Sequence, residues 1–411
     1  MPNGSHGQNA GAGALLAILR DGRARTRAEL AELTGLSRST VSQRLDGLIA
    51  QHWVVAGEGS ISSGGRPAAV FAFNEGARVV LAADLGATHA RLAVVDLGLT
   101  VLAERAMELP VDRGPERTLE RVVTAFRELL AADGPDPAHV CGVGVGLPGP
   151  VEHASGRPVN PPLMPGWDGF PVPEWLGERL AVPPAGPEAG PEAGPEVARV
   201  PVDRVLVDND VNMMALGEHW AAGPAVDHLI FIKMGTGIGC GIITGGRLHR
   251  GAQGAAGDVG HVRVPASDAP CRCGNSGCLE AVAGGASMAA VLREAGIEAR
   301  GGRDVVALMR AGDLRATRLV RQAGREVGTV MASIVNFFNP SVIVIGGDIA
   351  EAGEQVLAGV RETIYSRSLP LATQHLAIRA SELRDRAGVV GAALMVVEDV
   401  LAPDAIDRAV T

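Results

Sequence analysis

VVLAADLGATHARLAVVDLG, residues 79–98, is the stretch that decides the fold. Two runs of apolar residues flank a short polar turn, a pattern typical of two β-strands joined as a hairpin. Asp84, Gly86 and Thr88 alternate with small residues in this turn. Glycine lets a phosphate approach the backbone, threonine offers a hydroxyl group, and aspartate can organise a hydrated magnesium ion. The stretch therefore predicts a strand-rich lobe with a candidate phosphate-binding turn.

The same combination of strand and glycine turn occurs twice more. HLIFIKMGTGIGCGIITGG (228–246) repeats the hairpin, and SVIVIGGDIAEAG (341–353) places two glycines after a strand and before a helix, where helix-terminal amides can face a nucleotide. Each turn alone could be a hairpin that needs positive φ. Together the three turns favour a nucleotide site. The candidate nucleotide-binding residues are Asp84, Gly86, Thr88, Gly235, Thr236, Gly237, Gly346 and Gly347.

Two further strands end in polar residues. VGVGLPGPVE (143–152) is a strand followed by a Pro/Gly loop, and VLVDNDVNMMALGEHW (205–220) is a strand followed by a helix. Ligands of α/β folds gather at the carboxyl ends of strands, so Asn209 and Asp210 project where a small polar molecule would bind. A carboxylate there can accept the proton of a hydroxyl group that attacks a phosphoryl group. The alternative, that Asp210 caps the helix, is compatible with this role.

Three of the five cysteines of the chain lie within CRCGNSGCLE, residues 271–280. A histidine upstream completes a set of one imidazole and three thiolates within 18 positions: His261, Cys271, Cys273 and Cys278. This donor set is typical of a closed, tetrahedral, structural Zn²⁺ site. Free reduced thiols beside an unrelated histidine are the alternative. The zinc ion would hold Glu280, which follows directly, in a rigid position.

Residues 26–50, TRAELAELTGLSRSTVSQRLDGLIA, have the pattern of two short helices joined by a tight turn. Thr26 and Glu29 form a capping box, Gly35 supplies the turn, and Ser37 can cap a second helix that runs to about residue 50. On that helix Val41, Leu45, Leu48 and Ile49 form an apolar stripe. An apolar-faced helix over residues 10–20 precedes this pair.

The opposite face of the second helix carries arginine, hydroxyl and amide groups. A helix that recognises bases in the DNA major groove needs such groups. WVVAGEGSISSGGRPAAVFAFN (53–74) then alternates like a hairpin whose tip carries an arginine suited to a phosphate or the minor groove. The candidate DNA-binding residues are Arg38, Ser39, Thr40, Gln43, Arg44 and Arg66. A three-helix interaction module with a solvated arginine face is the alternative reading.

The composition sets the broad class. A chain of 411 residues with 46% hydrophobic and 20% charged residues is long enough for two or three domains with real cores. Its net charge of -9 argues against a protein that binds nucleic acid over its whole surface. Residues 1–75 differ from the rest, because they hold seven arginines and six acids and are slightly basic. No apolar run approaches the roughly 20 residues of a membrane helix, and the N-terminus lacks signal-peptide features. We therefore expect a cytoplasmic protein without a membrane partner, and a solvated loop at 183–196, PPAGPEAGPEAGPE.

In their order along the chain, these motifs resemble the ROK family, which unites bacterial sugar kinases and sugar-responsive repressors. The motifs are DLGATHAR, GVGLPGP, DNDVN, MGTGIG, GDVGH with CRCGNSGCLE, and VIVIGG, and the resemblance covers essentially all of residues 78–400. LTGLSRSTVSQRLDGLI followed by GGRP is similar to the winged helix of the repressor branch. The resemblance implies an α/β chain in which a winged helix-turn-helix precedes a two-lobed, actin-like ATPase (ribonuclease H-like) sugar-kinase fold.

The resemblance also implies domain bounds and site residues. The winged helix would span 1–77, the small lobe 78–200 with a C-terminal helix 386–411 returning to it, and the large lobe 201–385 with the zinc loop. The implied sugar contacts are Asn209, Asp210, Asp258, His261 and Glu280. Asp210 takes the position of the kinases' catalytic base, and His261 would share its two nitrogens between zinc and sugar.

Two positions depart from the family pattern. Asp258 stands where the kinases usually have glutamate, and its shorter side chain can change which sugar is preferred. Asp348 replaces a glycine of the adenosine motif and places a charge near the expected nucleotide.

Three functions are consistent with these features. The favoured one is a sugar-responsive transcriptional regulator, in the repressor mode, of carbohydrate metabolism genes. Its partners would be double-stranded operator DNA, a sugar or sugar-phosphate effector, and further copies of the chain in a homodimer or homotetramer, because a pseudo-palindromic operator needs two readers. The alternatives are a regulator that also phosphorylates its sugar with ATP and Mg²⁺, and a hexose kinase whose N-terminal unit has another role.

Overall fold

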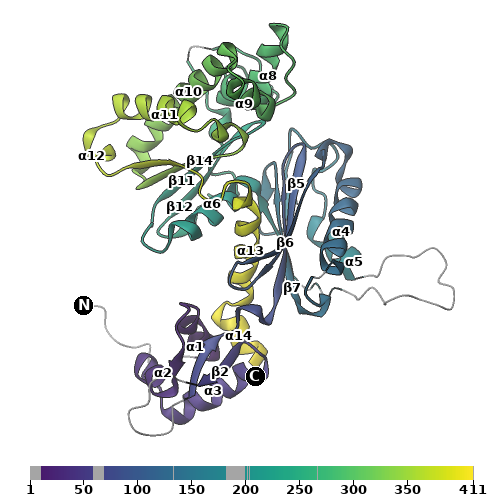
Figure 1. Cartoon of the computed structure of the whole chain (residues 1–411), viewed down its shortest axis with the longest axis vertical. Helices are drawn as coiled ribbons and strands as arrows, with labels where there is room; N and C mark the ends of the chain where they lie inside the picture. The colour runs from purple at the N-terminus through teal and green to yellow at the C-terminus, as the bar shows by residue number, and fades with distance from the viewer. Residues whose placement is uncertain are drawn as a thin grey trace, which may run out of the picture.

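The computed structural model consists of three folded units that follow one another along the long axis of the molecule (Figure 1). The N-terminal unit lies at one end, a first lobe in the middle and a second lobe at the other end. The described residues are 11–58, 69–132, 134–181, 200, 202, 204–265 and 267–410. Within these ranges no helix is both long and apolar enough to cross a membrane. Arg66 and the segment 183–196 lie outside the described residues.

The N-terminal unit is a winged helix. Its elements are α1 (Ala12–Leu19), β1 (Arg25–Thr26), α2 (Arg27–Thr34), α3 (Arg38–Ala50), β2 (Val54–Glu58) and β3 (Ala69–Phe73). The strands form an antiparallel sheet in the order β1-β3-β2. The predicted helix-turn-helix and hairpin are confirmed, while the short strand β1 was not predicted.

Local sequence signals set the ends of α2 and α3. The backbone N–H of Glu29 donates to the Thr26 hydroxyl and the Glu29 carboxylate accepts from the Thr26 N–H, which completes the capping box. Gly35 ends α2 with a φ of 70°, a left-handed conformation that favours glycine. Ser37 caps α3 by accepting a hydrogen bond from the Thr40 N–H. The apolar stripe of α3 then faces the core, with Leu45 fully buried.

The first lobe is built on a five-stranded sheet in the order β10-β7-β4-β5-β6. Its elements are β4 (Val79–Leu85), β5 (His89–Asp96), β6 (Val101–Glu108), α4 (Pro115–Ala131), β7 (Val140–Leu147), β8 (Val151–Glu152), β9 (Arg157–Pro158), α5 (Val172–Ala181) and β10 (Val205–Asn209). Helices α4 and α5 pack on one face of the sheet, and α13 (Ala387–Val400) packs on the other. Since β10 pairs in parallel with β7, this lobe extends past the boundary expected after residue 200.

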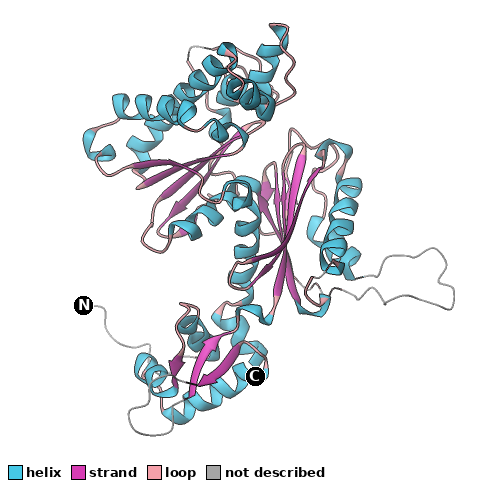
Figure 2. Cartoon of the chain, viewed as in Figure 1, coloured by secondary structure: helices cyan, strands magenta, loops and turns pink. Residues whose placement is uncertain are grey.

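The second lobe contains a sheet in the order β13-β12-β11-β14-β15, with helices on both faces (Figure 2). Its elements are α6 (Asp210–Ala222), β11 (Leu229–Met234), β12 (Ile238–Thr244), β13 (Arg247–Leu248), α7 (Leu279–Ala283), α8 (Gly285–Glu294), α9 (Gly302–Arg310), α10 (Leu314–Phe338), β14 (Val342–Gly346), α11 (Glu354–Arg367), α12 (Pro370–Thr373) and β15 (Ala377–Ala380). In both lobes an antiparallel hairpin continues on one side into two parallel strands. This duplicated topology confirms the expected two-lobed fold.

Helices α6 and α13 join the two lobes. α6 packs on β11 and β12 of the second sheet and also against α13, which covers β4 and β7 of the first. The two helices approach so closely that a Cβ atom at Gly391 would lie 1.7 Å from the Met213 carbonyl oxygen, and one at Gly217 would lie 2.3 Å from that of Ala387. Glycine is therefore required at both crossing points.

The C-terminal segment differs from the single returning helix expected over residues 386–411. α13 ends at Val400, and a separate helix, α14 (Pro403–Val410), begins at a proline, which lacks the N–H needed to continue a helix. α14 leaves the first lobe and packs against α1 of the winged helix, where the Gly13 N–H donates to Asp407 Oδ1 at 2.8 Å. The last described helix therefore packs on the winged helix as well as following the helix of the first lobe.

Candidate functional site

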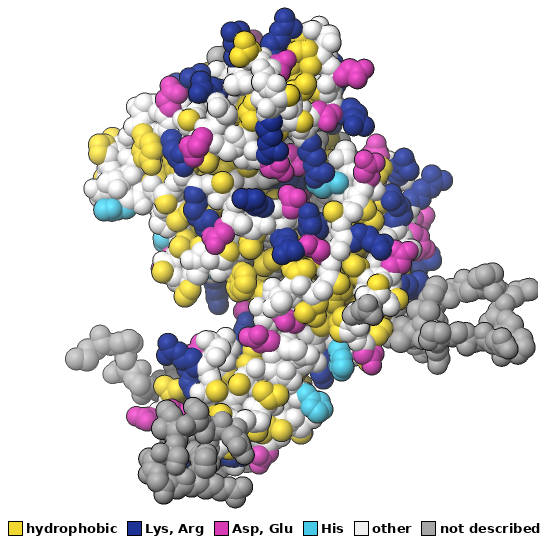
Figure 3. All heavy atoms as spheres, in the orientation of Figure 1, with side chains coloured by type: hydrophobic (Ala, Val, Ile, Leu, Met, Phe, Trp, Pro, Cys, Tyr) yellow, Lys and Arg dark blue, Asp and Glu magenta, His cyan; other side chains and the backbone are white. Residues whose placement is uncertain are grey.

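A cavity of about 760 Å³ lies between the two lobes and is lined by residues from both. Charged side chains of both signs lie over the region where the lobes meet (Figure 3). Among the lining residues are all five predicted sugar contacts: Asn209, Asp210, Asp258, His261 and Glu280. Five residues that are separated by up to 71 positions in the sequence thus face one volume, as a binding site requires.

The predicted nucleotide-binding residues are only partly at this cavity. Those that line it are Asp84, Gly86, Gly235, Thr236, Gly237 and Gly347. Thr88 and Gly346 do not line it. Gly346 has a packing role instead, because a Cβ atom there would lie 2.4 Å from the Phe231 ring.

Asn209 connects the end of β10 to the start of α6. Its side-chain oxygen accepts a hydrogen bond from the Val211 N–H at 2.9 Å, so Asn209, and not Asp210, caps α6. Its amide nitrogen donates to the Gly149 carbonyl oxygen at 2.9 Å, which ties the loop after β7 to the site.

Asp210 is buried and forms an ion pair with Lys233 of β11. The sequence analysis did not identify Lys233, because a lone lysine among apolar strand residues gives no motif. Asp84, at the end of β4, is also buried, and burial raises the pKa of its carboxyl group to about 7, against the attraction of Lys233. Although burial lowers the pKa of Lys233, the carboxylates of Asp210 and Asp84 outweigh it, and the pKa of Lys233 is raised.

The turn after β14 differs from the prediction. No α-helix follows Gly347 directly; a 3₁₀ turn, Asp348–Ala352, separates it from α11. In this turn Asp348 accepts a hydrogen bond from Nε of Arg303 on α9, at 2.9 Å. The charge of Asp348 near the expected nucleotide position is therefore paired within the protein. Arg303 is a further lining residue that the sequence analysis missed.

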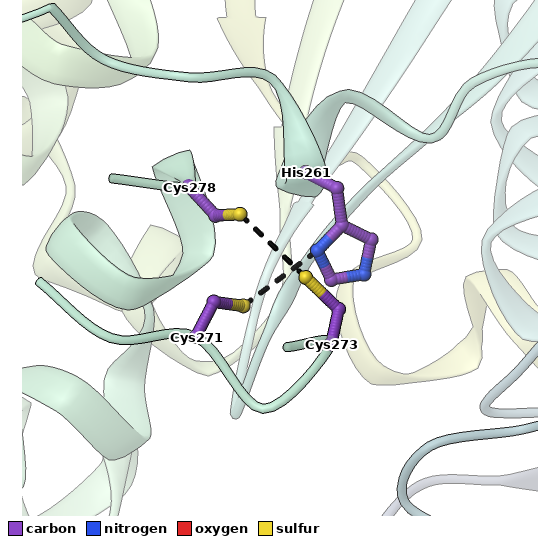
Figure 4. A group of neighbouring side chains, drawn as sticks. All are labelled: His261, Cys271, Cys273 and Cys278. Atoms are coloured by element: carbon purple, nitrogen blue, oxygen red, sulfur yellow. Dashed lines mark hydrogen bonds between the residues drawn. The ribbon is translucent and has the colours of Figure 1, made fainter. Parts of the chain in front are cut away.

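The predicted metal ligands lie together (Figure 4). Sγ of Cys271 is 3.7 Å from Nδ1 of His261, and Sγ of Cys273 is 3.7 Å from Sγ of Cys278. The four ligand atoms lie within 4.8 Å of one another. Such separations fit a tetrahedral site, in which neighbouring sulfur atoms about 2.3 Å from an ion lie nearly 4 Å apart. The cluster can hold a metal ion.

The metal cluster and the cavity share two residues, His261 and Cys273. With Nδ1 of His261 facing the sulfur atoms, Nε2 is free to face Asp258, whose Oδ1 is 3.9 Å away. Glu280 lies in the first turn of α7, directly after the cluster, and its Oε2 accepts a hydrogen bond from the Ile238 N–H at 3.2 Å. A Cβ atom at Gly237 would lie 2.1 Å from the same Oε2 atom, so this glycine leaves the space that Glu280 fills.

A second polar surface lies on α3, far from the cavity (Figure 1). Arg38, Ser39 and Gln43 are exposed there, whereas Thr40 and Arg44 are partly buried. The Thr40 hydroxyl lies 2.8 Å from that of Ser37, at the helix N-terminus. Arg38, Ser39 and Gln43 all lie in the N-terminal half of α3.

A winged helix followed by two lobes of equivalent topology, with a polar cavity between the lobes, defines a winged-helix protein of the two-lobed sugar-kinase fold. The ROK family model matches residues 80–185 and 199–399. The chain therefore belongs to the ROK family. The MarR family model matches residues 11–59, which contain the helix-turn-helix.

Relatives of known class fall into two groups. The xylose repressor of Caldicellulosiruptor bescii is 28% identical over 405 residues, which cover 94% of this chain and 95% of the relative. The structure of a ROK family transcriptional regulator, a homologue of the E. coli MLC protein, matches with a TM-score of 0.76 and 25% identity over 97% of this chain and 98% of the other. A ROK family glucokinase from Streptomyces griseus, solved with glucose and AMPPNP, matches with a TM-score of 0.61 and 29% identity over 77% of this chain and 98% of its own.

Proposed function

We propose that this chain is a sugar-responsive transcriptional repressor of carbohydrate metabolism genes. One observation carries the proposal: similarity to the repressor and the regulator covers at least 94% of the chain, whereas similarity to the glucokinase covers 77%. The winged helix, residues 11–58 and 69–77, accounts for most of this difference. A ROK chain with a winged helix in front of its two lobes can combine DNA binding with sugar binding.

The DNA contact in this proposal is made by α3. Arg38, Ser39 and Gln43 lie exposed on its N-terminal half, the part of a recognition helix that reaches base edges in the major groove. Arg66, which the sequence predicts at a hairpin tip and which lies outside the described residues, would add a phosphate or minor-groove contact. Two copies of the chain would read the two halves of a pseudo-palindromic operator, so a homodimer or homotetramer is part of the proposal.

The effector in this proposal is a sugar or sugar phosphate bound between the lobes. Asn209, Asp258, His261 and Glu280 offer the mixture of donors and acceptors that sugar hydroxyl groups pair with. His261, Cys271, Cys273 and Cys278 would hold a structural Zn²⁺ ion. A bound ion would hold His261 and the start of α7, which carries Glu280, in place; with Nδ1 of His261 among the ligands, Nε2 would remain as an oriented group for a sugar hydroxyl.

The structure offers a direct route from the cavity to the DNA-binding unit. Asp210 begins α6 at the cavity, α6 packs against α13, and α13 continues into α14, which packs against α1. A sugar that binds one arrangement of the lobes more tightly shifts the population toward it and moves α6 relative to α13. The expected result is a change in the spacing of the paired winged helices.

A DNA-binding experiment tests this proposal. Operator fragments would be selected from genomic DNA with the full chain and then used in gel-shift assays. Arg38→Ala should weaken operator binding by about 1–3 kcal/mol while sugar-induced thermal stabilisation is unchanged. Arg23→Ala, an exposed arginine outside α3, is the matched control. Unchanged shifts with Arg38→Ala and Gln43→Ala together would remove the regulator proposal.

Sugar phosphorylation is the weaker candidate, favoured by the similarity to the glucokinase and by Asp210 at the cavity. ATP consumption with a panel of pentoses, hexoses and N-acetylhexosamines tests it, with Asp210→Asn as the control for a general base. Turnover that is lost in the variant would establish a kinase, and no turnover with any sugar would leave a sensor.

A further inference from the structure

The cleft contains a largely buried ammonium group that is paired with one carboxylate, and a second buried acidic side chain lines the same cavity. Lys233 lies on β11 with a side chain only 17% exposed, and its Nζ donates a hydrogen bond to Oδ2 of Asp210, whose side chain is 4% exposed. Lys233 and Asp210 both line the cavity. Lys233 is the residue directly before Met234 and the glycine turn at 235–239, so its ammonium group stands at the end of β11 where the two lobes face each other.

Asp84 is the second carboxylate. It reaches the cavity from the first lobe, at the end of β4, and 92% of its surface is buried. Its Oδ1 atom has no hydrogen-bond partner among the described residues. After burial, the two strongest electrostatic influences on Asp84 are the attraction of Lys233 and the repulsion of Asp210. Lys233 and the two acidic side chains therefore influence one another electrostatically, and the direct ion pair of Lys233 is with Asp210.

This arrangement does not fit a divalent metal ion. Magnesium needs six oxygen ligands at about 2.0–2.1 Å and keeps several of its waters, so it occupies considerable space in front of the carboxylates it binds. Here the Lys233 ammonium group already bonds to Asp210, and its positive charge would repel a second cation placed between Asp210 and Asp84. In the turn after β14, the negative charge of Asp348 is likewise compensated by the protein, because it pairs with Arg303.

We propose that Lys233 is a built-in cation that takes the place of a divalent metal ion beside Asp210, on the cavity wall that Asp84 also lines, and holds Asp210 as a hydrogen-bond acceptor rather than a proton acceptor. Two consequences follow. The cleft binds its ligand without magnesium, and Asp210 is not free to act as a general base. This inference depends on the cleft alone and not on DNA binding, so gel-shift results cannot decide it either way.

Mn²⁺ is a suitable probe, because its free form gives an electron paramagnetic resonance signal that is lost on binding. The zinc-loaded full chain would be titrated with Mn²⁺ without sugar or nucleotide, as wild type, Lys233→Met and Lys233→Met/Asp84→Asn. Methionine keeps the length and flexibility of lysine but not its charge. We expect the wild type and the double variant to bind Mn²⁺ equally weakly. Lys233→Met should bind one Mn²⁺ ion per chain, about tenfold more tightly than the wild type does.

Two results would overturn the inference. One is a wild-type Mn²⁺ site that Asp84→Asn removes, a comparison that does not depend on the folding of any Lys233 variant. The other is a Lys233→Met chain that keeps the wild-type circular dichroism spectrum and melting behaviour but binds no additional Mn²⁺. ATP turnover by the wild type that Lys233→Met abolishes would also contradict the inference, since Lys233 would then serve a phosphate group.

Discussion

The backbone N–H of Gly13 in α1 donates a hydrogen bond to Oδ1 of Asp407 in α14, across 394 positions of the chain. A Cβ atom at Gly13 would lie 2.3 Å from the Pro403 carbonyl oxygen, so the two helices meet backbone to backbone. Arg20 of the winged helix also pairs with Glu398 of α13, at 2.5 Å. The winged helix is thereby attached to the helix that packs on the first lobe.

The Asp407 contact gives the first prediction. Asp407→Ala leaves a partly buried N–H without its partner, which should cost about 1–3 kcal/mol of docking between α14 and α1. We expect the variant to bind operator DNA but to lose much of the change in affinity that sugar causes. Gel shifts with and without sugar measure this. Asp404→Ala, an exposed position on the same helix, is the control, and an unaltered sugar response in Asp407→Ala would rule out α14 as the connection.

The metal cluster gives the second prediction. Cys278→Ser removes a buried ligand, so the purified chain should lose its bound zinc, and its melting temperature should fall. Elemental analysis and thermal unfolding test both points. Cys141→Ser, at a cysteine on β7 outside the cluster, should keep one zinc ion per chain. A metal-free wild type would contradict the zinc proposal.

Gly237 gives the third prediction. In Gly237→Ala the new methyl group would meet Oε2 of Glu280 at 2.1 Å, so the Glu280 side chain must leave its present position in the cavity wall. We expect sugar affinity to fall by about tenfold, which corresponds to the loss of one hydrogen bond. Gly301→Ala is the matched control, because a Cβ atom there has open space. Calorimetric titration distinguishes the two variants, and equal affinities would mean that Glu280 does not contact the sugar.

The buried carboxyl group of Asp84 gives a prediction about pH. Burial raises its pKa to about 7 in the folded chain, so between about pH 4 and 7 the folded state holds a proton that the unfolded state has released. The free energy of unfolding contributed by Asp84 should therefore fall as pH rises through this window and level off above it. Asp84→Asn should lack this decline. Denaturant unfolding at pH 5 and pH 8 measures it; an identical pH dependence in both proteins would show that Asp84 is ionised throughout.

Much of the fold was predictable because its signals are local. The capping box of Thr26 and Glu29, the turn at Gly35 and the two strand hairpins each depend on residues a few positions apart. The metal cluster was predictable for the same reason: three of its ligands lie within eight positions, and cysteine is otherwise scarce in the chain.

The features that sequence reasoning missed depend on contacts between distant segments. Lys233 is a single charge in an apolar strand, and its partner Asp210 belongs to another element. The sequence predicts the charge of Asp348 near the nucleotide position but not its pairing with Arg303, which lies 45 positions earlier. Pro403 could have signalled the break between α13 and α14, but nothing in the sequence of α14 indicates that it packs on α1.

The most direct test of the central claim is the operator affinity of the full chain measured against increasing sugar concentration. Thermal-shift screening of pentoses, hexoses, N-acetylhexosamines and their phosphates first identifies a sugar that binds. We expect this sugar to change the operator affinity until it reaches a plateau, and Glu280→Gln to shift the midpoint to a higher sugar concentration. A sugar that stabilises the protein but leaves operator affinity constant over the whole titration would contradict it.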